Sequence, residues 1–476
     1  MTPDVLGTLL PGFAGPTLPD WLKARLRAGL GGVCLFATNI ESPSQLRALT
    51  DAIYAENPRA LIATDEEGGD VTRLFARQGS PSPGNAVLGR IDDPDTTAYA
   101  ARQTGEQLRR AGVNVNFAPT VDINSNPDNP VIGVRSFGDR AEHVARHGAA
   151  WVTALQATGV AATAKHFPGH GDTALDSHLA LPVIDRSADD LRSRELVPFV
   201  ATVQAGVRLV MTSHILLPQL DTDQPTTMSA PILGGLLRAE LGFDGVIVSD
   251  ALDMAGAQSP GGLGETAARS LTAGCDLLCL GTDNSDADLS AIEQAVATGG
   301  VDPARIAEAA DRVLSLADDL KTERLRLEPV DGTSTSSGPM VSNDQLIRTF
   351  DVQPPTSGWR PTSPNAVTVV RLQARPNSAS GSVPWGPPPS DSEIAVTADR
   401  PLPATPTSSE AVLVIGQDIH RHPFARAAVD RLRAEHGQVL VVDMGWPSPD
   451  RRYADVATFG AAPMLGRALL ELLRLG

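Results

Sequence analysis

The chain has 476 residues, a net charge of −17, 42% hydrophobic residues and only 4% aromatic residues. This length exceeds one ordinary domain, so we expect one large α/β barrel and a smaller second domain. The acidic charge disfavours nucleic acid and anionic membranes as partners, because both select clustered positive charge.

The cysteines and the first residues indicate the compartment. Cys34, Cys275 and Cys279 are odd in number and lie in apolar runs, which favours buried thiols over a disulfide framework or a zinc site. No basic residue precedes Lys23 and no cleavage motif follows a long apolar run, so we expect neither a signal peptide nor a membrane span. The sequence therefore predicts a soluble, cytoplasmic protein.

Up to about residue 325, short apolar runs alternate with longer amphipathic stretches such as 42–56 and 287–299. Continuous apolar runs are typical of parallel strands that are buried on both faces. Eight such runs followed by helices predict a (β/α)8 TIM-type barrel. The expected strands are 8–13, 32–36, 60–65, 113–119, 160–166, 208–214, 245–250 and 275–281.

Polar residues gather where these strands end. They are Asp65, the stretch after residue 119, Lys165 with His166, His214 and Asp250. Reactions in this fold occur at the carboxyl ends of the strands, where side chains from different strands converge. The sequence therefore predicts the active site at this end of the barrel.

A linker and a second domain are expected after the barrel. We predict a catalytic barrel domain over 1–327, a linker over 328–364 and a smaller α/β domain over 365–476. In this last domain, 367–372, 411–416 and 438–445 are expected strands, and 423–437 and 462–476 are expected helices. No constellation of chemically active residues is apparent there.

The segment AKHFPGHGDTALDSH, residues 164–178, holds three of the nine histidines and one of only three lysines. His166 and His170 have the spacing of a helical metal-binding pair, but Pro168 and the neighbouring glycines prevent a helix. We therefore expect no metal. A serine hydrolase is also disfavoured, because the chain has no G-x-S-x-G motif.

The same segment fits acid–base chemistry better. Lys165 and His166 end a strand and would be held rigidly above the barrel, where they can donate hydrogen bonds to a hydroxylated ligand. The glycine-rich loop that follows carries Asp176 and His178, and a carboxylate beside an imidazole raises its basicity and fixes its tautomer. Asp250, at the end of another strand, is placed to act as a carboxylate nucleophile.

Six motifs in order resemble the bacterial β-N-acetylglucosaminidases of glycoside hydrolase family 3. The motifs are LFATNI, ATDEEGGDVTRL, NFAPTVDINSNPDNPVIGVRSFGD, AKHFPGHGDTALDSH, VMTSHI and GVIVSDALDMAG, and the resemblance covers most of residues 8–325. It implies a retaining mechanism in which Asp250 is the nucleophile and an Asp176–His178 dyad replaces the second carboxylate of most glycosidases.

The resemblance also implies a sugar-binding set. By motif position, the residues that would bind the sugar are Asp65, Arg73, Arg135, Lys165 and His166, and His214 would line the pocket. A salt bridge at the barrel rim is the alternative role for Arg73 and Arg135. His170 and Asp172 are assigned to shaping the loop.

The chain departs from the family in one motif. The family usually shows D-Q-E-G-G-R-V where this chain has DEEGGDV, so Glu66 and Asp70 replace a neutral and a basic residue. We expect sugar binding through Asp65 and Arg73 to survive. The added negative charge, expected near the rim, affects the preference for the leaving group.

The leading hypothesis is an exo-acting retaining β-N-acetylglucosaminidase that acts on peptidoglycan fragments in cell-wall recycling and needs no cofactor. A phosphorolytic enzyme is the first alternative, because a neutral or cationic histidine would let phosphate approach the glycosyl-enzyme where a carboxylate would repel it. The second alternative is an inactive sugar-binding module. The expected ligand is a small N-acetylglucosamine-containing carbohydrate, with no nucleic acid and no membrane, and the sequence indicates no protein partner.

Overall fold

A computed structural model describes residues 3–177, 179–327, 341–353, 359, 361–363, 366–376, 379–389, 393–403 and 410–475. The chain forms two compact units. The first comprises Met1–Glu66, Thr97–Ile123 and Asp139–Ser337, and the second comprises Glu67–Thr96, Asn124–Gly138 and Gly338–Gly476. Two segments from the first part of the chain, Glu67–Thr96 and Asn124–Gly138, thus belong to the second unit.

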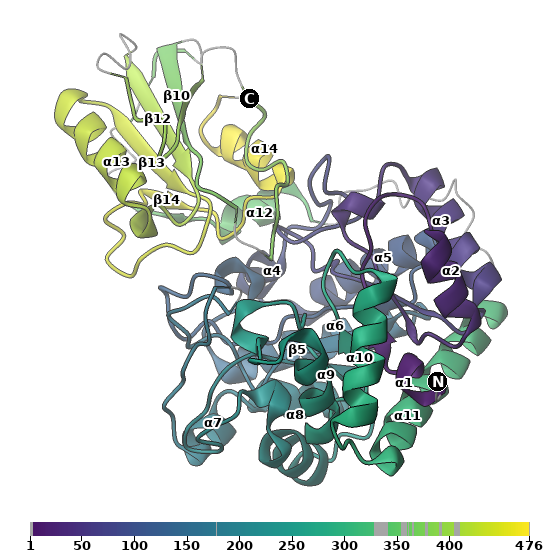
Figure 1. Ribbon diagram of the computed structural model, residues 1–476. Coiled ribbons are helices and arrows are strands. Elements are labelled where there is room, and N and C mark those ends of the chain that lie inside the picture. Colours follow the sequence, from purple (N-terminus) through teal and green to yellow (C-terminus); the bar gives the residue numbers. More distant parts are fainter. Residues whose placement is uncertain are drawn as a thin grey trace. The chain divides into compact units, whose positions relative to one another are not determined.

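The first unit contains eight strands, and their pairings are parallel. Figure 1 labels one of them, β5. The strands are β1 Leu9–Leu10, β2 Gly32–Cys34, β3 Leu61–Thr64, β4 Val115–Asn116, β5 Ala161–Phe167, β6 Leu209–Thr212, β7 Val246–Val248 and β8 Leu278–Cys279. Each lies within one of the eight predicted apolar runs, apart from the last residue of β5.

The eight strands close into a barrel. Strands β2 to β7 pair in chain order, and β1 pairs with β8. The ring is completed by hydrogen bonds from Ser249 N to Leu277 O at 2.9 Å and from Cys34 N to Pro11 O at 3.0 Å. One buried cluster contains side chains from all eight strands. Residues between them, such as Ile62, are also buried, so both faces of the strands are apolar. The predicted barrel is confirmed.

Helices surround the barrel strands (Figure 1). They include α1 Pro3–Gly7, α2 Asp20–Arg27, α3 Pro43–Glu56, α5 Pro94–Ala111, α6 Ala141–Gln156, α7 Ala188–Ser193, α8 Val197–Gln204, α9 Gly262–Ala273, α10 Asp286–Thr298 and α11 Pro303–Arg326, with a π-helix at Pro231–Glu240. Local signals define several starts. Ser42 accepts a hydrogen bond from Gln45 N at 3.2 Å and Pro43 opens α3, as helix capping favours.

The second unit is a sheet covered by helices on both faces (Figure 1). Its strand order is β11-β10-β12-β13-β14-β9, and β9 is antiparallel. Alternate strand residues pack on α13 on one face and on α12, α14 and α4 on the other. The bounds are β9 Asp351–Val352, β10 Val367–Leu372, β11 Ile394–Val396, β12 Ala411–Gly416, β13 Val439–Asp443, β14 Val456–Ala457, α4 Asn85–Ile91, α12 Asn343–Thr349, α13 Pro423–Glu435 and α14 Pro463–Leu472.

Part of the segment predicted as linker, 328–364, is regular structure. Helix α12 and strand β9 lie within it, because Ser342 and Gln345 form a capping box and Leu346 and Phe350 enter the core of the second unit. Residues 328–340, 354–358, 360 and 364–365 lie outside the described residues. The boundaries at 327 and 365 stay a prediction.

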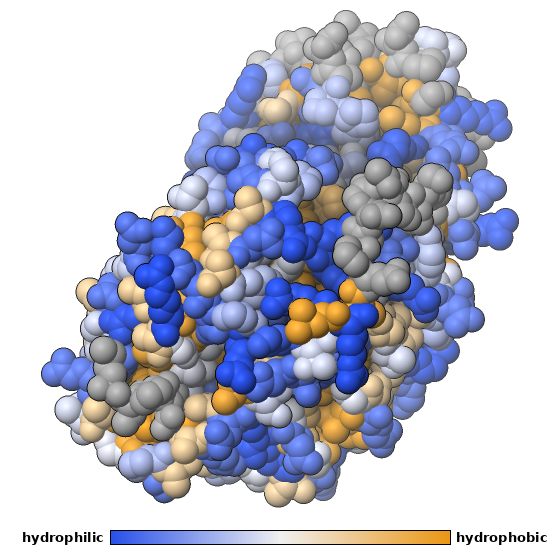
Figure 2. Space-filling view, turned by 90° about the vertical axis from the view of Figure 1, so that its right-hand side faces the viewer, coloured by the Kyte–Doolittle hydropathy of each residue, from blue (hydrophilic) through white to orange (hydrophobic). Residues whose placement is uncertain are grey.

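The surface and the thiols agree with the composition. On the face that Figure 2 shows, hydrophilic residues predominate and apolar residues form small patches between them. Cys34, Cys275 and Cys279 are buried thiols outside any disulfide, as predicted. In the described part of the chain, no helix is both long and apolar enough to cross a membrane.

Candidate functional site

Asp65 and Lys165 form an ion pair at the carboxyl ends of β3 and β5. Lys165 Nζ lies 2.7 Å from Asp65 Oδ1, and the exposed fractions of the side chains are 2% and 18%. The side chain of Asn116, the last residue of β4, holds the chain after Asp65, because it accepts from Glu66 N at 3.0 Å and donates to Glu66 O at 2.9 Å. Strand β4, which pairs with both β3 and β5, thus fixes the position of the Asp65 carboxylate.

Asp122 is a site residue that the sequence analysis did not single out. Its fully buried carboxylate lies 2.7 Å from His166 Nδ1 and accepts from His166 N at 3.1 Å and from His170 N at 2.6 Å. Burial opposes ionisation, but His166 and the backbone donors outweigh it, so the pKa of Asp122 is below its usual value. Asp122 therefore orients the His166 ring. Its position after a predicted strand, in the motif APTVD, was the available signal.

His170 shapes the loop after β5. Its Nε2 lies 3.0 Å from Ser177 Oγ and its Nδ1 lies 2.9 Å from Thr173 Oγ1. Burial, with a contribution from nearby His166, lowers the pKa of His170 to about 4, so the ring is neutral near pH 7. Asp172 accepts from Arg186 Nε at 2.9 Å and from Arg194 Nη2 at 3.0 Å. Both residues thus hold the loop, which is the role expected for them.

The loop that carries Asp176 lies against the loop that carries Asp250. Ser177 O accepts from Gly256 N at 3.0 Å, and a Cβ on Gly256 would lie 2.9 Å from that oxygen, so glycine is required for this close approach. Asp176 is mostly buried, and its carbonyl accepts from Leu179 N at 3.0 Å. His178 lies outside the described residues. The Asp176–His178 dyad therefore stays a prediction.

Asp250 follows β7, and its carboxylate accepts from Ala251 N at 2.8 Å. His214, after β6, is fully buried. Its Nε2 lies 3.0 Å from Ala251 O and its Nδ1 lies 2.8 Å from Thr227 Oγ1. Both ring nitrogens of His214 thus face protein atoms, and one of them contacts the Asp250 loop. The role of His214 in lining the sugar pocket stays a prediction.

Arg135 makes a bidentate ion pair within the second unit. Its Nε and Nη2 lie 3.0 and 2.7 Å from the two carboxylate oxygens of Glu67, and Nη1 donates to Val131 O at 3.0 Å. The guanidinium also lines a pocket of about 210 Å³ in this unit. Arg135 thus forms a buried salt bridge with Glu67. Its expected roles, sugar binding or a salt bridge at the barrel rim, stay predictions.

Arg73 donates to main-chain carbonyls. Its Nη2 lies 2.8 Å from Ala379 O and its Nη1 lies 3.4 Å from Ser380 O, all within the second unit. Sugar binding and a rim salt bridge were the two roles expected for Arg73, and main-chain carbonyl partners were not predicted. Residues 379 and 380 follow Arg73 by some three hundred positions, so no local pattern in the sequence could reveal the contact.

Of the two departures from the family motif, Glu66 is buried and Asp70 is half-buried, and their effect on the preference for the leaving group stays a prediction. Glu66 has an exposed fraction of 2%. Asp70 accepts from Gln417 Nε2 at 2.8 Å and from Ala461 N at 3.1 Å, so it binds other parts of the second unit. Burial, with nearby Asp418, raises the pKa of Asp70 to about 6. The carboxylate at position 70 therefore serves the packing of the second unit.

Replacing Asp70 tests its raised pKa. Between about pH 4 and pH 6 the folded protein holds a proton that the unfolded chain has released, so the free energy of unfolding falls as pH rises through that window. Asp70→Asn removes the titration but keeps an oxygen for Ala461 N. In denaturant titrations between pH 4 and pH 7, we expect the free energy of unfolding of the variant to rise by on the order of 1 kcal/mol relative to that of wild type. If the difference in the free energy of unfolding between variant and wild type does not change with pH, the raised pKa of Asp70 is contradicted.

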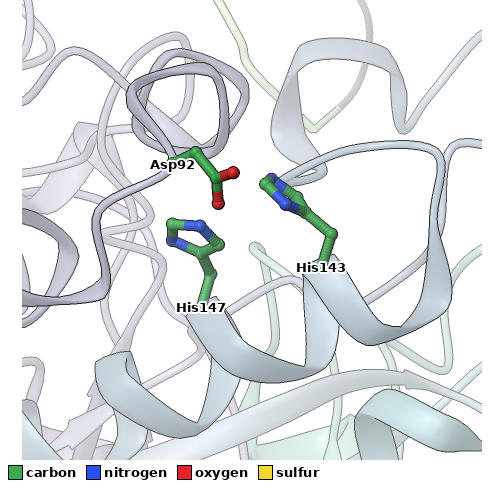
Figure 3. Close-up of side chains that lie close together, drawn as sticks. All are labelled: Asp92, His143 and His147. Atoms are coloured by element: carbon green, nitrogen blue, oxygen red, sulfur yellow. The ribbon is translucent and has the colours of Figure 1, made fainter.

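A pair of histidines with helical metal-ligand spacing lies elsewhere. His143 and His147 are one turn apart on α6 (Figure 3), with ring centroids 4.7 Å apart. His147 Nδ1 lies 2.7 Å from Thr97 Oγ1, and Arg146 Nη2 lies 3.3 Å from His143 Nδ1. A guanidinium beside one ring disfavours a cation, so we assign no metal to the pair. Asp92, also labelled in Figure 3, belongs to the second unit.

Comparison with known proteins identifies the family of this barrel. Residues 18–316 match the glycosyl hydrolase family 3 N-terminal domain. The chain belongs to glycoside hydrolase family 3. The family resemblance of the six motifs is thereby confirmed.

Similar proteins carry hexosaminidase names. The chain is 42% identical over 262 residues to beta-hexosaminidase A of Pseudoalteromonas piscicida, a match that spans 50% of this chain and 44% of that protein. It is 38% identical over 292 residues to the beta-hexosaminidase of Nitrosomonas eutropha, with 60% and 83% covered. A family 3 beta-N-acetylglucosaminidase from Paenibacillus sp. superposes with a TM-score of 0.84 at 30% identity, with 99% and 96% covered. This last structure shares both units.

Proposed function

We propose that this family 3 protein is an exo-acting retaining β-N-acetylglucosaminidase. The observation that carries the proposal is the Asp65–Lys165 pair at 2.7 Å, at the end of the barrel where Asp250 follows β7. Carboxylates and a buried ammonium at the mouth of one barrel suit a ligand rich in hydroxyl groups. The names of the hexosaminidase relatives support N-acetylglucosamine as the sugar.

Asp65 and Lys165 would hold the terminal sugar. Asp65 can accept hydrogen bonds from neighbouring hydroxyl groups, and Lys165 Nζ can donate to an oxygen while it keeps its pairing with Asp65. Both bonds are charge-assisted and therefore stronger than neutral ones. His166, whose ring Asp122 orients, is a further sugar-binding residue of the proposal, and the sugar-binding roles of Arg73, Arg135 and His214 stay predictions.

The reaction would proceed in two steps. Asp250 attacks the anomeric carbon and forms a glycosyl ester, while His178 donates a proton to the departing oxygen. His178 then removes a proton from water, which attacks the same carbon and releases the sugar with retained configuration. Asp176 supports the imidazole. Leu175 and Leu179, on either side of position 178, are exposed, as expected of a loop that closes over a bound ligand.

The substrate class follows from the sugar. Peptidoglycan fragments carry terminal β-linked N-acetylglucosamine, and the proposal places their degradation in cytoplasmic cell-wall recycling. Phosphorolysis is the alternative fate of the glycosyl-enzyme, because the proposed acid/base carries no negative charge. Water and phosphate give different products from the same first step.

An assay with two substrates and two acceptors tests the function. The purified protein should release nitrophenol from 4-nitrophenyl β-N-acetylglucosaminide much faster than from the β-glucoside. With phosphate present, the sugar product should remain free N-acetylglucosamine. A sugar 1-phosphate as the main product would establish the phosphorolytic alternative, and turnover of neither substrate in the folded protein would contradict both.

Lys165→Met should weaken sugar binding while nearly preserving side-chain volume. Loss of one charge-assisted hydrogen bond costs about 1.5–3 kcal/mol, so kcat/KM should fall roughly 10- to 100-fold. Steady-state kinetics and calorimetry with N-acetylglucosamine measure the change. Lys23→Met is the matched control, because Lys23 forms a 2.8 Å pair with Asp20 that is exposed on the surface. Unchanged affinity in Lys165→Met would remove Lys165 from the sugar site.

A further inference from the structure

A second pocket lies at the opposite ends of the barrel strands. It has a volume of about 230 Å³ and is lined by residues that precede β4 and β5, including Asn114 and Gly159. Asp65, Lys165 and Asp250 lie at the carboxyl ends of their strands. The pocket therefore belongs to the amino-terminal face of the first unit and is separate from the proposed sugar site.

Four arginines line this pocket in a protein that carries a net charge of −17. Arg47 comes from α3, Arg109 and Arg110 come from the last turn of α5, and Arg324 comes from the last turn of α11. Cations in the last turn of a helix are expected from the helix dipole. The helix dipole does not explain why arginines from three helices line the same pocket.

Tyr54 is the observation that points to a ligand. Its side chain lines the pocket and is 8% exposed, and its hydroxyl has no hydrogen-bond partner among the described residues. Leaving a buried hydroxyl without a partner costs roughly 1–3 kcal/mol. The guanidinium of Arg324 packs 3.8 Å from the ring centroid and holds the ring in place. Burial raises the pKa of Tyr54, so the group is a neutral phenol that can donate its proton.

The arginines are held by neighbours without losing their donor capacity. Arg47 Nε and Nη2 lie 3.0 and 2.8 Å from Asp51 Oδ1, Arg110 Nη2 lies 3.7 Å from Glu106, and Arg324 Nη2 donates to Pro58 O at 3.2 Å. Each guanidinium carries five N–H donors, so the contacts of Arg47 and Arg324 leave further donors for a ligand. Burial lowers the pKa of Arg109; Glu106 acts against this shift and Arg110 adds to it.

We propose that this pocket binds a phosphate dianion, either inorganic phosphate or the phosphoryl group of a small phosphorylated metabolite. Guanidinium groups pair with phosphate oxygens through two parallel N–H donors, and the Tyr54 hydroxyl donates to a third oxygen. The volume lies below the roughly 300–1,000 Å³ of pockets for drug-sized ligands, which favours a small anion. The site is independent of the proposed glycosidase activity.

Calorimetry on the full chain tests the proposal. Inorganic phosphate, glucose 6-phosphate and sodium chloride are titrated at constant ionic strength, and saturable binding of at least one phosphate compound is expected. Tighter binding of glucose 6-phosphate would identify a metabolite, and equal or weaker binding would identify the free anion. Tyr54→Phe, which keeps the ring beneath Arg324, should weaken binding roughly 2- to 10-fold, the equivalent of one neutral hydrogen bond. Arg109→Gln should weaken it about 10-fold or more.

Arg102→Gln is the matched control, because Arg102 lies on α5 but is exposed and does not line the pocket. It should bind phosphate as the wild type does. Circular dichroism and thermal unfolding establish that each variant is folded. The proposal is overturned if wild type shows no saturable binding, or if folded Tyr54→Phe and Arg109→Gln bind as tightly as wild type. Binding retained in those variants would place the anion elsewhere, for example near Asp250, where phosphate would be the acceptor in phosphorolysis.

Discussion

Asp250→Asn is expected to lower kcat roughly 10⁴- to 10⁶-fold without unfolding the protein, in line with the removal of catalytic nucleophiles from other enzymes. The amide cannot form the glycosyl ester, and the residue lies after the end of β7, outside the buried core. The hydrogen bond that the carboxylate accepts from Ala251 N can also be accepted by the asparagine oxygen. Steady-state kinetics and thermal unfolding provide the two measurements.

Asp244→Asn is the control for that experiment. Asp244 is an exposed aspartate at the other end of the same strand, so its replacement changes the net charge equally and should leave turnover intact. A glycosyl-enzyme trapped on Asp250 with a fluorinated sugar and located by peptide mass spectrometry would support the nucleophile directly. Near-normal turnover of folded Asp250→Asn would remove this residue from the mechanism.

His178→Ala should harm substrates with poor leaving groups far more than activated ones. General acid–base catalysis contributes typically 10²- to 10⁴-fold, so kcat/KM for a disaccharide should fall within roughly that range. Nitrophenolate departs without protonation, so glycosylation by an aryl substrate should change little. The variant should then accumulate glycosyl-enzyme, and azide should restore part of its turnover. Asp176→Ala should give a milder form of the same pattern, because it supports the imidazole without transferring the proton.

Ser177→Ala separates proton transfer from loop shape. Ser177 Oγ lies 3.0 Å from His170 Nε2, so its removal loosens the loop but leaves the histidine at position 178. Equal losses for good and poor leaving groups are expected in Ser177→Ala. The same equal losses in His178→Ala would show that His178 shapes the loop or binds the substrate and does not transfer the proton.

Much of the barrel was predictable from residues 1–325 alone. Strands that are buried on both faces must be apolar throughout, so β3, β5 and β7 appear in the sequence as uninterrupted runs. Parallel strands in a barrel all end at the same face, so Asp65, Lys165 and Asp250 could be assigned to one site before any contact was known. The shorter elements α12 and β9 were missed, because a seven-residue helix and a two-residue strand leave too little periodicity.

The sequence by itself thus determined the barrel and the family of the chain, and it predicted which end of the barrel carries the active site. Only the tertiary structure decided the partner of each charged side chain. Lys165 pairs with Asp65, one hundred residues away, and Arg73 donates to Ala379, more than three hundred residues away. Asp70 is half-buried and accepts a hydrogen bond from Gln417, more than three hundred residues away. The reason is that a strand's burial follows from its own residues, whereas an ion pair or a pKa depends on which distant loops pack together around the group.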